Sequence, residues 1–384
     1  MQLFIIFMIV LTLSYAVLII ALLLGWKKVE KFKLKGVTPA NKFSIIIPFR
    51  NEAENLPALL YSLSNLDYPR SYFEIILVND DSEDNSLQAC FNFKQSHPNL
   101  VFSIINNNRK TNSPKKDAII TAIEASRFEN ILTTDADCIV PSKWLEAYNE
   151  SVLGTKANLI AGPVSFLNGP SNKEKFLNYL IAFQDLDFMS LQAVSIGAFG
   201  LKKPFMCNAA NMCYKKDAFL NAEGYVGNSN ISGGDDVFLL QKFIELNYPV
   251  SYLKSEVAIV KTKPQPSLES LFSQRIRWAA KATAYKSTFA KLVGLIVLLV
   301  NLFLVIGLIL TLLNKVNYEL VLFSFLIKFL VDFILLYHSA IFFRKQLILS
   351  HYLWSSLLYP FFSTTVAIAS LFSGFQWKGR NFRK

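Results

Sequence analysis

Charged side chains are scarce in this sequence of 384 residues. Asp, Glu, Lys and Arg make up 17% of the chain, whereas hydrophobic residues make up 52%. Because about a quarter of an ordinary globular domain is charged, the composition argues against a chain built only of soluble domains. The apolar excess lies in a few long blocks, which predicts segments that cross a membrane.

Cysteine is also rare, and its positions lack the spacing of metal ligands. We interpret Cys90, Cys138, Cys207 and Cys213 as free thiols packed in a core. No glycine-rich dinucleotide fingerprint follows the first predicted strand, which argues against a nicotinamide-dependent enzyme. The net charge of +11 comes without a nucleic-acid-binding motif. We therefore attribute it to a membrane surface and to phosphate chemistry, and expect no nucleic acid partner.

Four apolar blocks each have about the length of one membrane span. The first runs from Leu3 to Leu24, with no basic region before it and no small-x-small cleavage pattern after it. A membrane span is therefore a better interpretation than a signal peptide. The other blocks follow the central region, at Phe289 to Leu313, Tyr318 to Phe343 and roughly Leu353 to Phe375.

Lysines indicate the orientation of the chain. Five of them follow the first block: Lys27, Lys28, Lys31, Lys33 and Lys35. The positive-inside rule places this side in the cytoplasm. We therefore predict an N-terminal membrane helix (1–26), a cytoplasmic domain (27–266), an interfacial amphipathic helix (267–288) and a C-terminal membrane region (289–384). The expected location is the bacterial cytoplasmic membrane.

The C-terminal tail conflicts with this rule. Four crossings would leave its basic residues outside: Lys378, Arg380, Arg383 and Lys384. Lys328 and Asp332, four residues apart inside an apolar block, either pair there or mark that block as re-entrant or split. A re-entrant block would return the tail to the cytoplasm, which is the arrangement we favour.

Strands alternate with helices between residues 43 and 134. The predicted strands are Phe43 to Pro48, Phe73 to Val78, Val101 to Ile105 and Asn130 to Thr134; the predicted helices are Asn51 to Leu63, Ser82 to Phe93 and Ala118 to Ala125. This alternation predicts βαβ units in a mostly parallel sheet, whose ligands bind at the carboxyl ends of the strands.

Acidic residues follow three of these strands. Glu52 follows the first, Asp80 the second, and Asp135 and Asp137 the fourth. Two carboxylates one residue apart are hard oxygen ligands of the kind that suits Mg²⁺ or Mn²⁺. A solvated turn is the alternative for an isolated Asp-x-Asp, and Asp84 is equally well explained as a turn or helix cap.

Two further motifs extend the site. Lys115 and Lys116 precede a helix, where a cation is unfavourable unless an anion such as phosphate binds there. Gly233 to Asp236 is a flexible Gly-Gly-Asp-Asp segment before another helix. Helix capping explains one aspartate, so the second is a candidate general base.

The segment from Leu268 to Tyr285 mixes aromatic, apolar and basic residues, as an interfacial amphipathic helix does. It contains the pentapeptide Gln274-Arg275-Ile276-Arg277-Trp278. Anchoring at the membrane interface explains the Arg and Trp residues. We prefer a role for Arg277 on a leaving diphosphate, because guanidinium binds phosphate in bidentate geometry.

Six segments in this order resemble glycosyltransferase family 2: IIIPFRNEAENL, VNDDSEDNS, PKKDAI, TTDADC, GGDD and QRIRW. More narrowly, they are similar to its membrane-embedded members, the chitin, hyaluronan and poly-N-acetylglucosamine synthases and the ceramide glucosyltransferases. The resemblance covers nearly the whole chain. It implies a GT-A type, Rossmann-like mixed sheet, a nucleotide-sugar donor that is usually a UDP sugar, a lipid or glycan acceptor, and a divalent metal.

The resemblance also implies residue roles. Glu52 and Asp80 match nucleoside contacts, Lys115 matches the lysine of a G-K-x-x-A stretch, and Asp135 and Asp137 match the metal and diphosphate motif; Asp236 matches the base, and Gln274, Arg277 and Trp278 match the Q-x-x-R-W motif. The base could also be Asp235, because Gly234-Asp235 replaces the usual Thr-Glu.

The expected reaction is inverting transfer by a single displacement. Processive polysaccharide synthesis and transfer to one lipid acceptor, such as a polyprenyl phosphate or carotenoid-like lipid, both remain open. The tail Trp377-Lys378-Gly379-Arg380 resembles carotenoid-type members, and polymer synthases tend to have more spans. An inactive membrane scaffold is a remote alternative.

Overall fold

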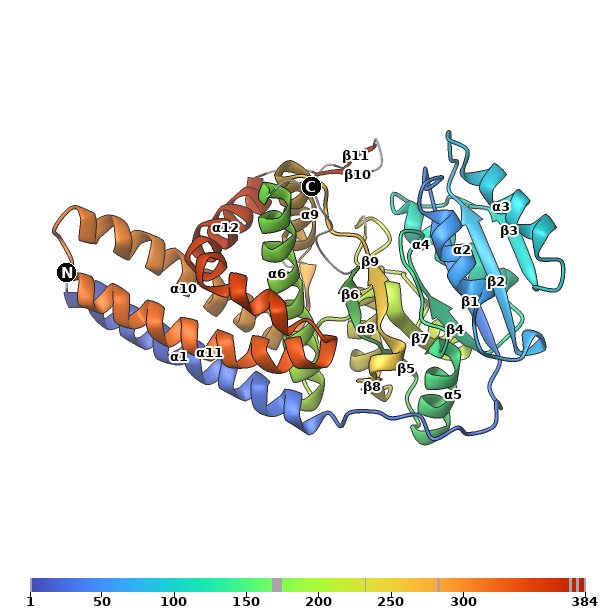
Figure 1. Cartoon of the computed structure of the whole chain (residues 1–384), viewed down its shortest axis with the longest axis horizontal. Coiled ribbons are helices and arrows are strands. Elements are labelled where there is room, and N and C mark those ends of the chain that lie inside the picture. Colours follow the sequence, from blue (N-terminus) through green and yellow to red (C-terminus); the bar gives the residue numbers. More distant parts are fainter. Residues whose placement is uncertain are drawn as a thin grey trace. The chain divides into compact units, whose positions relative to one another are not determined.

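The computed structural model describes residues 2–167, 175–231, 233–281, 284–372, 375–377 and 380–382. The chain divides into two compact units (Figure 1). The first, which we call the sheet unit, comprises Glu30–Leu167 and Met206–Lys263. The second, the helical unit, comprises Met1–Val29, Asn168–Phe205 and Pro264–Lys384.

The sheet unit contains a seven-stranded mixed sheet in the order β3-β2-β1-β4-β7-β5-β8. The strands are β1 (Phe43–Phe49), β2 (Phe73–Asn79), β3 (Phe102–Asn106), β4 (Asn130–Thr133), β5 (Leu159–Ala161), β7 (Met212–Lys215) and β8 (Val250–Tyr252). β1 pairs in parallel with β2 and β4, and β7 is antiparallel to both of its neighbours. The predicted parallel core and mixed sheet are confirmed.

Helices complete the sheet unit, and two of them begin later than predicted. They are α2 (Leu56–Ser64), α3 (Ser86–Ser96), α4 (Pro114–Ala125), α5 (Trp144–Gly154), α7 (Lys216–Asn221) and α8 (Asp235–Glu245), with a small ladder of β6 (Val164–Phe166) and β9 (Val260–Thr262). The starts of α2 and α3 were predicted at Asn51 and Ser82. Both residues instead belong to loops that bind each other, since the Asn51 N–H donates to Ser82 Oγ at 3.1 Å and Asn51 has a positive φ of 50°.

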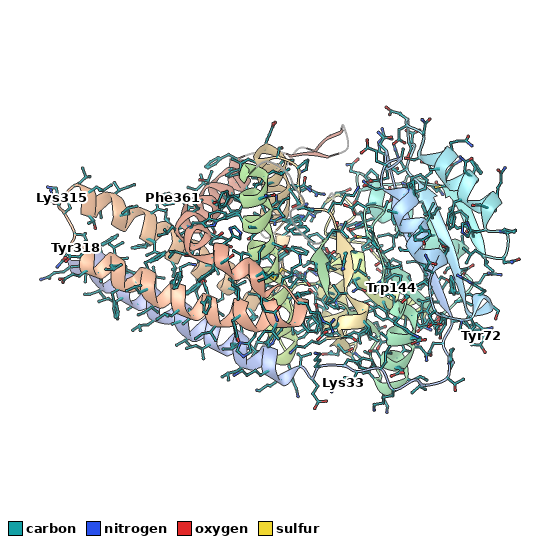
Figure 2. All side chains as sticks on the ribbon, in the orientation of Figure 1. Lys33, Tyr72, Trp144, Lys315, Tyr318 and Phe361 are labelled. Carbon is teal, nitrogen blue, oxygen red and sulfur yellow. The ribbon has the colours of Figure 1, made fainter. Side chains whose placement is uncertain are left out.

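The extended segment before β1, which includes Lys33 (Figure 2), is held by α5. Glu150 accepts hydrogen bonds from the backbone N–H groups of Lys35 and Val37 at 2.9 to 3.0 Å. Asn149 accepts two from the side chain and backbone of Asn41 at 3.0 Å. These bonds satisfy backbone donors that have no strand partner.

A buried asparagine fixes the start of β7. Asn211 Oδ1 accepts hydrogen bonds from Trp144 Nε1 at 2.9 Å and from the Tyr148 hydroxyl at 2.8 Å. Its Nδ2 donates to the carbonyl oxygens of Pro163 and Ala258 at 2.7 and 2.8 Å. Trp144 is labelled in Figure 2. Because a fully bonded polar group avoids the penalty of burial, this network locks the backbone beside the end of β4.

Among its described residues, the helical unit contains four helices that are long and apolar enough to cross a membrane, at Gln2–Lys28, Thr288–Leu312, Tyr318–Phe343 and Gln346–Phe372. They correspond to α1 (Gln2–Lys28), α10 (Thr288–Leu312), α11 (Tyr318–Phe343), and a short 3₁₀ turn (Gln346–His351) followed by α12 (Tyr352–Phe372). The predicted one N-terminal and three C-terminal spans are therefore found.

One long helix of this unit was not predicted. α6 (Lys175–Gly200) lies within the stretch that we assigned to a single domain over 27–266, yet it packs against α1 and α11. Glycines allow the close approach: a Cβ on Gly200 would lie 1.9 Å from the carbonyl oxygen of Gly25, and one on Gly197 would lie 2.4 Å from that of Leu22. The sheet unit is thus interrupted by an insertion that belongs with the apolar helices.

The ionisable pair in α11 forms as one of our alternatives expected. Lys328 Nζ lies 2.5 Å from Asp332 Oδ2, and the Tyr15 hydroxyl donates to Asp332 Oδ1 at 2.6 Å. The helix runs unbroken through both residues, so the block is not split. Of the basic tail residues, Lys378, Arg383 and Lys384 lie outside the described residues.

The four cysteines are buried free thiols, as predicted. Burial raises the pKa of Cys90 and of Cys213 to about 12. Neither thiol is a nucleophile at neutral pH, because the thiolate is the reactive form.

Candidate active site

The parallel strands place the predicted acids at one edge of the sheet. β1 and β2 are in register to their last residues, Phe49 opposite Asn79, and β4 pairs with β1 on the other side. Glu52, Asp80 and Asp135 therefore follow the carboxyl ends of three adjacent strands. In an open sheet of this kind, that edge is where ligands bind.

Asp137 lies in a crowded acidic environment. Burial, and then the negative charges of Asp135 and Glu52, raise the pKa of Asp137 to about 6. Within the described part of the chain, no three His, Cys, Asp or Glu side chains are arranged to hold a metal ion. A Mg²⁺ or Mn²⁺ ion needs only one or two carboxylates, since it completes its shell with water and phosphate oxygens. The donor atoms of Asp135 and Asp137 fit such an ion.

Lys115 connects the acidic edge to the Gly-Gly-Asp-Asp segment. Its Nζ lies 2.7 Å from Asp135 Oδ1 and 3.1 Å from Asp235 Oδ2. Burial alone would lower the pKa of Lys115, but the carboxylates of Asp135 and Asp235 outweigh it and raise the pKa. The lysine therefore stays charged and holds together two motifs that are about a hundred residues apart in the sequence.

The two aspartates at the start of α8 differ in environment. Gly234 precedes them in the left-handed conformation, with φ 70°, which an L side chain adopts at a cost. Asp235 is buried, whereas Asp236 is partly exposed. Asp236 accepts hydrogen bonds from the N–H groups of Ala209 at 3.3 Å and Val237 at 2.8 Å.

Lys116 does not share the environment of Lys115. Its side chain is completely buried and donates to the carbonyl oxygens of Asn228 and Ile231 at 2.7 and 2.9 Å. The ammonium also lies 4.8 Å from the ring centroid of Phe238. The interpretation of both lysines as phosphate ligands is therefore wrong for Lys116, which instead holds the loop that leads to Gly234.

Asp80 is bound by two residues that sequence reasoning missed. Asp80 Oδ1 accepts hydrogen bonds from Arg109 Nε at 2.6 Å and Asn107 Nδ2 at 2.7 Å. Both follow β3, in a polar run that starts at its carboxyl end, and this position was the available signal. Asp84 has a structural role, because it accepts hydrogen bonds from the N–H groups of Ser86 and Ala53 at 3.0 Å.

The pentapeptide lies in the helical unit, on α9 (Leu268–Ala280). This helix begins with a capping box of Ser267 and Ser270 and ends at Ala280, before the predicted Tyr285. Gln274, Arg277 and Trp278 are partly exposed, whereas Arg275 between them is buried.

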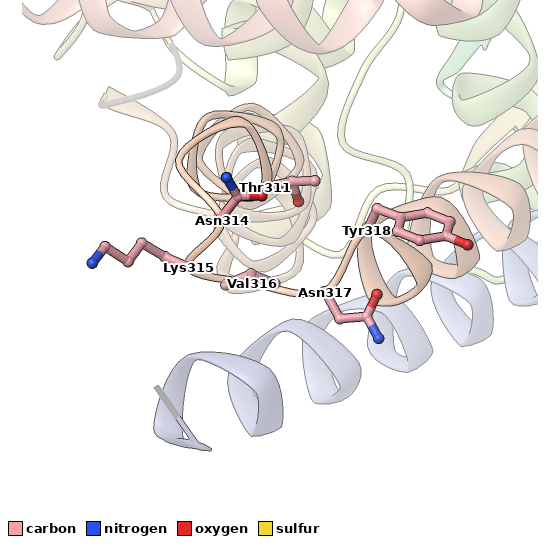
Figure 3. A pocket seen from close by; sticks show the side chains of 6 residues that line it. All are labelled: Thr311, Asn314, Lys315, Val316, Asn317 and Tyr318. Atoms are coloured by element: carbon pink, nitrogen blue, oxygen red, sulfur yellow. The ribbon is translucent and has the colours of Figure 1, made fainter.

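A cavity of about 310 Å³ lies at the turn between α10 and α11 (Figure 3). Its lining residues are Thr311, Asn314, Lys315, Val316, Asn317 and Tyr318. None of the predicted site residues lines it, so this cavity is not the candidate site.

The mixed sheet, with acids at the ends of three parallel strands, is the GT-A type arrangement that the sequence resemblance implied, and the chain also has apolar helices long enough to cross a membrane. Two family models match the sequence. The model of glycosyl transferase family 2 matches residues 44–201, and that of glycosyl transferase family group 2 matches residues 130–375. The second match covers more than half of the chain. The chain belongs to glycosyltransferase family 2 and is a glycosyltransferase.

Similar proteins come from archaea and bacteria. Glycosyltransferase AglE of Haloferax volcanii is 25% identical over 58% of this chain and 67% of its own length. A poly-beta-1,6-N-acetyl-D-glucosamine synthase of Staphylococcus epidermidis is 25% identical over 62% of this chain, and the match spans only 53% of the synthase. The mannosyltransferase PcManGT of Pyrobaculum calidifontis, solved with GDP-Man and Mn²⁺, covers 96% of this chain and 99% of its own, with a TM-score of 0.57 and 16% identity. This likeness is one of fold.

Proposed function

We propose that the protein is an inverting glycosyltransferase that moves a sugar from a nucleoside-diphosphate sugar to a hydroxyl group of a lipid or glycan acceptor beside a membrane. The observation that carries the proposal is the pairing of Lys115 with both Asp135 and Asp235. It joins the predicted donor side of the site to the segment with the predicted base. From the resemblance, a UDP sugar is the first donor to test.

The donor is proposed to lie across the carboxyl ends of the parallel strands. Glu52 and Asp80 contact the nucleoside, and Lys115 and Asp135 lie beside the diphosphate. Arg109, which holds the Asp80 carboxylate at 2.6 Å, fixes the orientation of that acid.

Asp135 and Asp137 are proposed to hold a Mg²⁺ or Mn²⁺ ion. Bound there, the ion would act as a Lewis acid that neutralises charge on the diphosphate. The raised pKa of Asp137 supports this assignment, because a cation relieves the repulsion among neighbouring carboxylates.

Asp236 is proposed as the general base. It accepts the proton of the acceptor hydroxyl while that oxygen forms a bond to the anomeric carbon. The bond from this carbon to the phosphate oxygen breaks, and the nucleoside diphosphate leaves. One displacement inverts the configuration. Partial exposure of Asp236 supports this choice over Asp235, which is buried and paired with Lys115.

Gln274, Arg277 and Trp278 are proposed to act in the same reaction, on the strength of the motif. Arg277 stabilises the leaving diphosphate, because a guanidinium group binds phosphate oxygens in bidentate geometry. Gln274 and Trp278 contribute to the acceptor side. The catalytic domain is proposed to face the cytoplasm, where nucleotide sugars are available.

Transfer to a single lipid acceptor and synthesis of a polymer remain two forms of this proposal. The similarity to a poly-N-acetylglucosamine synthase supports a polymer. The modest set of four apolar helices supports a single transfer. An inactive scaffold is the remote alternative.

The test is a panel of radiolabelled UDP and GDP sugars, incubated with membranes that contain the protein or its Asp137→Asn variant. We expect one donor to be turned over, EDTA to abolish transfer, and Mn²⁺ or Mg²⁺ to restore it. Sizing the product after lipase and glycosidase digestion separates a glycolipid from a polymer. Turnover of no donor contradicts the proposed function, and full activity after thorough chelation contradicts the metal assignment alone.

A further inference from the structure

A buried ion pair connects α6 to the pentapeptide of α9. Arg275 Nε donates to Asp187 Oδ2 at 2.6 Å, and the two side chains are 6% and 5% exposed. Arg275 Nη1 also donates to Oε1 of the neighbouring Gln274. The side-chain amide of Gln274 is thereby oriented by the same guanidinium group.

The same guanidinium group also lies over an aromatic ring. Its central carbon is 4.3 Å from the ring centroid of Trp278, three residues further along α9. The ring centroid of Phe188, the next residue after Asp187 on α6, lies 6.2 Å from the ring centroid of Trp278. Trp278 is thus in contact with Arg275 and with Phe188. We call Asp187, Phe188, Arg275 and Trp278 the clamp.

The clamp lies next to a membrane helix. The ring centroid of Tyr359 on α12 lies 6.5 Å from that of Phe183, which is one turn before Asp187 on α6, and Lys328 Nζ of α11 lies 5.2 Å from the Tyr359 ring centroid. Side chains from α11, α12, α6 and α9 therefore pack around the ion pair. Such packing restricts the rotamers of the side chains involved.

Stability alone does not account for the pair. A well-packed apolar pair of similar volume is often as stable as a buried ion pair, or more stable. Arg275 Nη2 is buried and has no hydrogen-bond partner among the described residues, so the burial is incompletely compensated. What this arrangement provides is geometry, because only a planar guanidinium group can bind a carboxylate at its edge and an aromatic ring at its face.

We propose that Asp187 and Arg275 are positioning residues for sugar transfer, which hold the Trp278 ring and the Gln274 amide in their working orientation. The inference rests on the proposed function, since it takes Gln274 and Trp278 to act in the reaction. Arg275 is separate from Arg277, for which we propose a direct contact with the diphosphate.

The principal test is Arg275→Lys, which retains the positive charge beside Asp187 but removes the planar group from Trp278. We expect kcat to fall by about tenfold or more, with an unchanged KM for the donor and a normal protein level in the membrane. The orientation of the ring is read separately by ¹⁹F NMR of protein labelled with 5-fluorotryptophan. The protein has five tryptophans, and the resonance of Trp278 is the one that is missing from the spectrum of Trp278→Phe. The chemical shift of this resonance should change in Arg275→Lys.

The matched control is Asp185→Asn. Asp185 is on the same helix, two residues from Asp187, and pairs with Lys345 at 2.7 Å with both side chains similarly buried. Its partner follows α11 and does not lie on α9. We expect this variant to keep the Trp278 resonance in place and the wild-type kcat per folded molecule, even where its unfolding temperature is lower.

Wild-type kcat in Arg275→Lys, or a kcat loss in Asp185→Asn equal to that in Arg275→Lys, would overturn the inference. A shifted resonance without a loss of kcat would also overturn it, since the orientation would then not matter for transfer. If the wild-type protein turns over no donor, the proposed function fails and this inference fails with it. An active wild type with an unaffected Arg275→Lys refutes the clamp alone.

Discussion

At the scale of residues, two adjacent aspartates have acquired different environments. Asp235 and Asp236 both occupy the first turn of α8, where the helix dipole favours negative charge. Asp235 turns into the protein and pairs with Lys115, whereas Asp236 stays partly exposed and is held by the Ala209 N–H group. A base must reach the acceptor hydroxyl, so partial exposure favours Asp236.

We predict that Asp236→Asn lowers kcat by roughly 10²-fold or more, which is the usual contribution of a general base. The donor KM should change little, because this group acts on the acceptor. Asp235→Asn should instead remove the ion pair that holds Lys115 to α8, leave this lysine less well positioned beside the diphosphate, and raise the donor KM. Steady-state kinetics on both variants with one donor provide the measurement. The roles are reversed if Asp235→Asn loses kcat and Asp236→Asn does not.

At the scale of elements, the contact between α1 and α6 depends on glycine. Gly25 and Gly200 let the two backbones approach so closely that no side chain fits between them. α1 is one of the four candidate spans and α6 is not, but small residues allow the same close packing that joins helices within membranes. The contact anchors α6, and with it Asp187 and Phe188 of the clamp.

We predict that Gly200→Ala destabilises the helical unit by about 1–3 kcal/mol, the usual penalty of overpacking. The control is Gly294→Ala on α10, where an added Cβ meets nothing within 4 Å. Because alanine favours helix over glycine by about 1 kcal/mol, this variant should be neutral or stabilised. Thermal unfolding of both variants in the same detergent gives the comparison. Equal shifts in the two would show that the contact of Gly200 with Gly25 does not limit packing.

At the scale of the whole chain, the open question is where the tail lies. α9 precedes α10 in the sequence, and β10 (Phe375–Trp377), which follows α12, packs beside α9. Pro360 interrupts the hydrogen-bonding pattern inside α12, where a proline kinks a helix. These observations favour a tail on the membrane face from which α10 starts. The re-entrant segment would then be α12, and α11 would cross completely.

We predict that a cysteine added after Lys384 is labelled from the same membrane face as Lys286→Cys, which precedes α10. Asn314→Cys, at the turn between α10 and α11, should be labelled from the opposite face. A membrane-impermeant maleimide applied to intact cells and to inverted vesicles makes the measurement, and the four native thiols are buried. Labelling of the tail together with Asn314→Cys would instead establish four full crossings.

Local sequence patterns determined the four strands of the parallel core, the four apolar helices and the acids at the strand ends, but not the strands from β5 to β9. A short apolar run or a helical spacing of apolar residues can be recognised from neighbouring residues alone. Once the strand ends were predicted, the positions of Glu52, Asp80 and Asp135 just after them were predicted as well. The apolar blocks are equally local, because the thickness of a bilayer sets their length. The order of motifs then led to the family.

Tertiary structure alone decided which of these groups meet. Lys115 looked like Lys116 in the sequence, but only Lys115 faces the acids, because the rotation of α4 is set by its packing on the sheet. Asp187 and Arg275 are 88 residues apart, and no local periodicity records such a pair. The late starts of α2 and α3 have the same origin, since a hydrogen bond between two loops that are distant in the sequence holds Asn51 and Ser82 outside the helices.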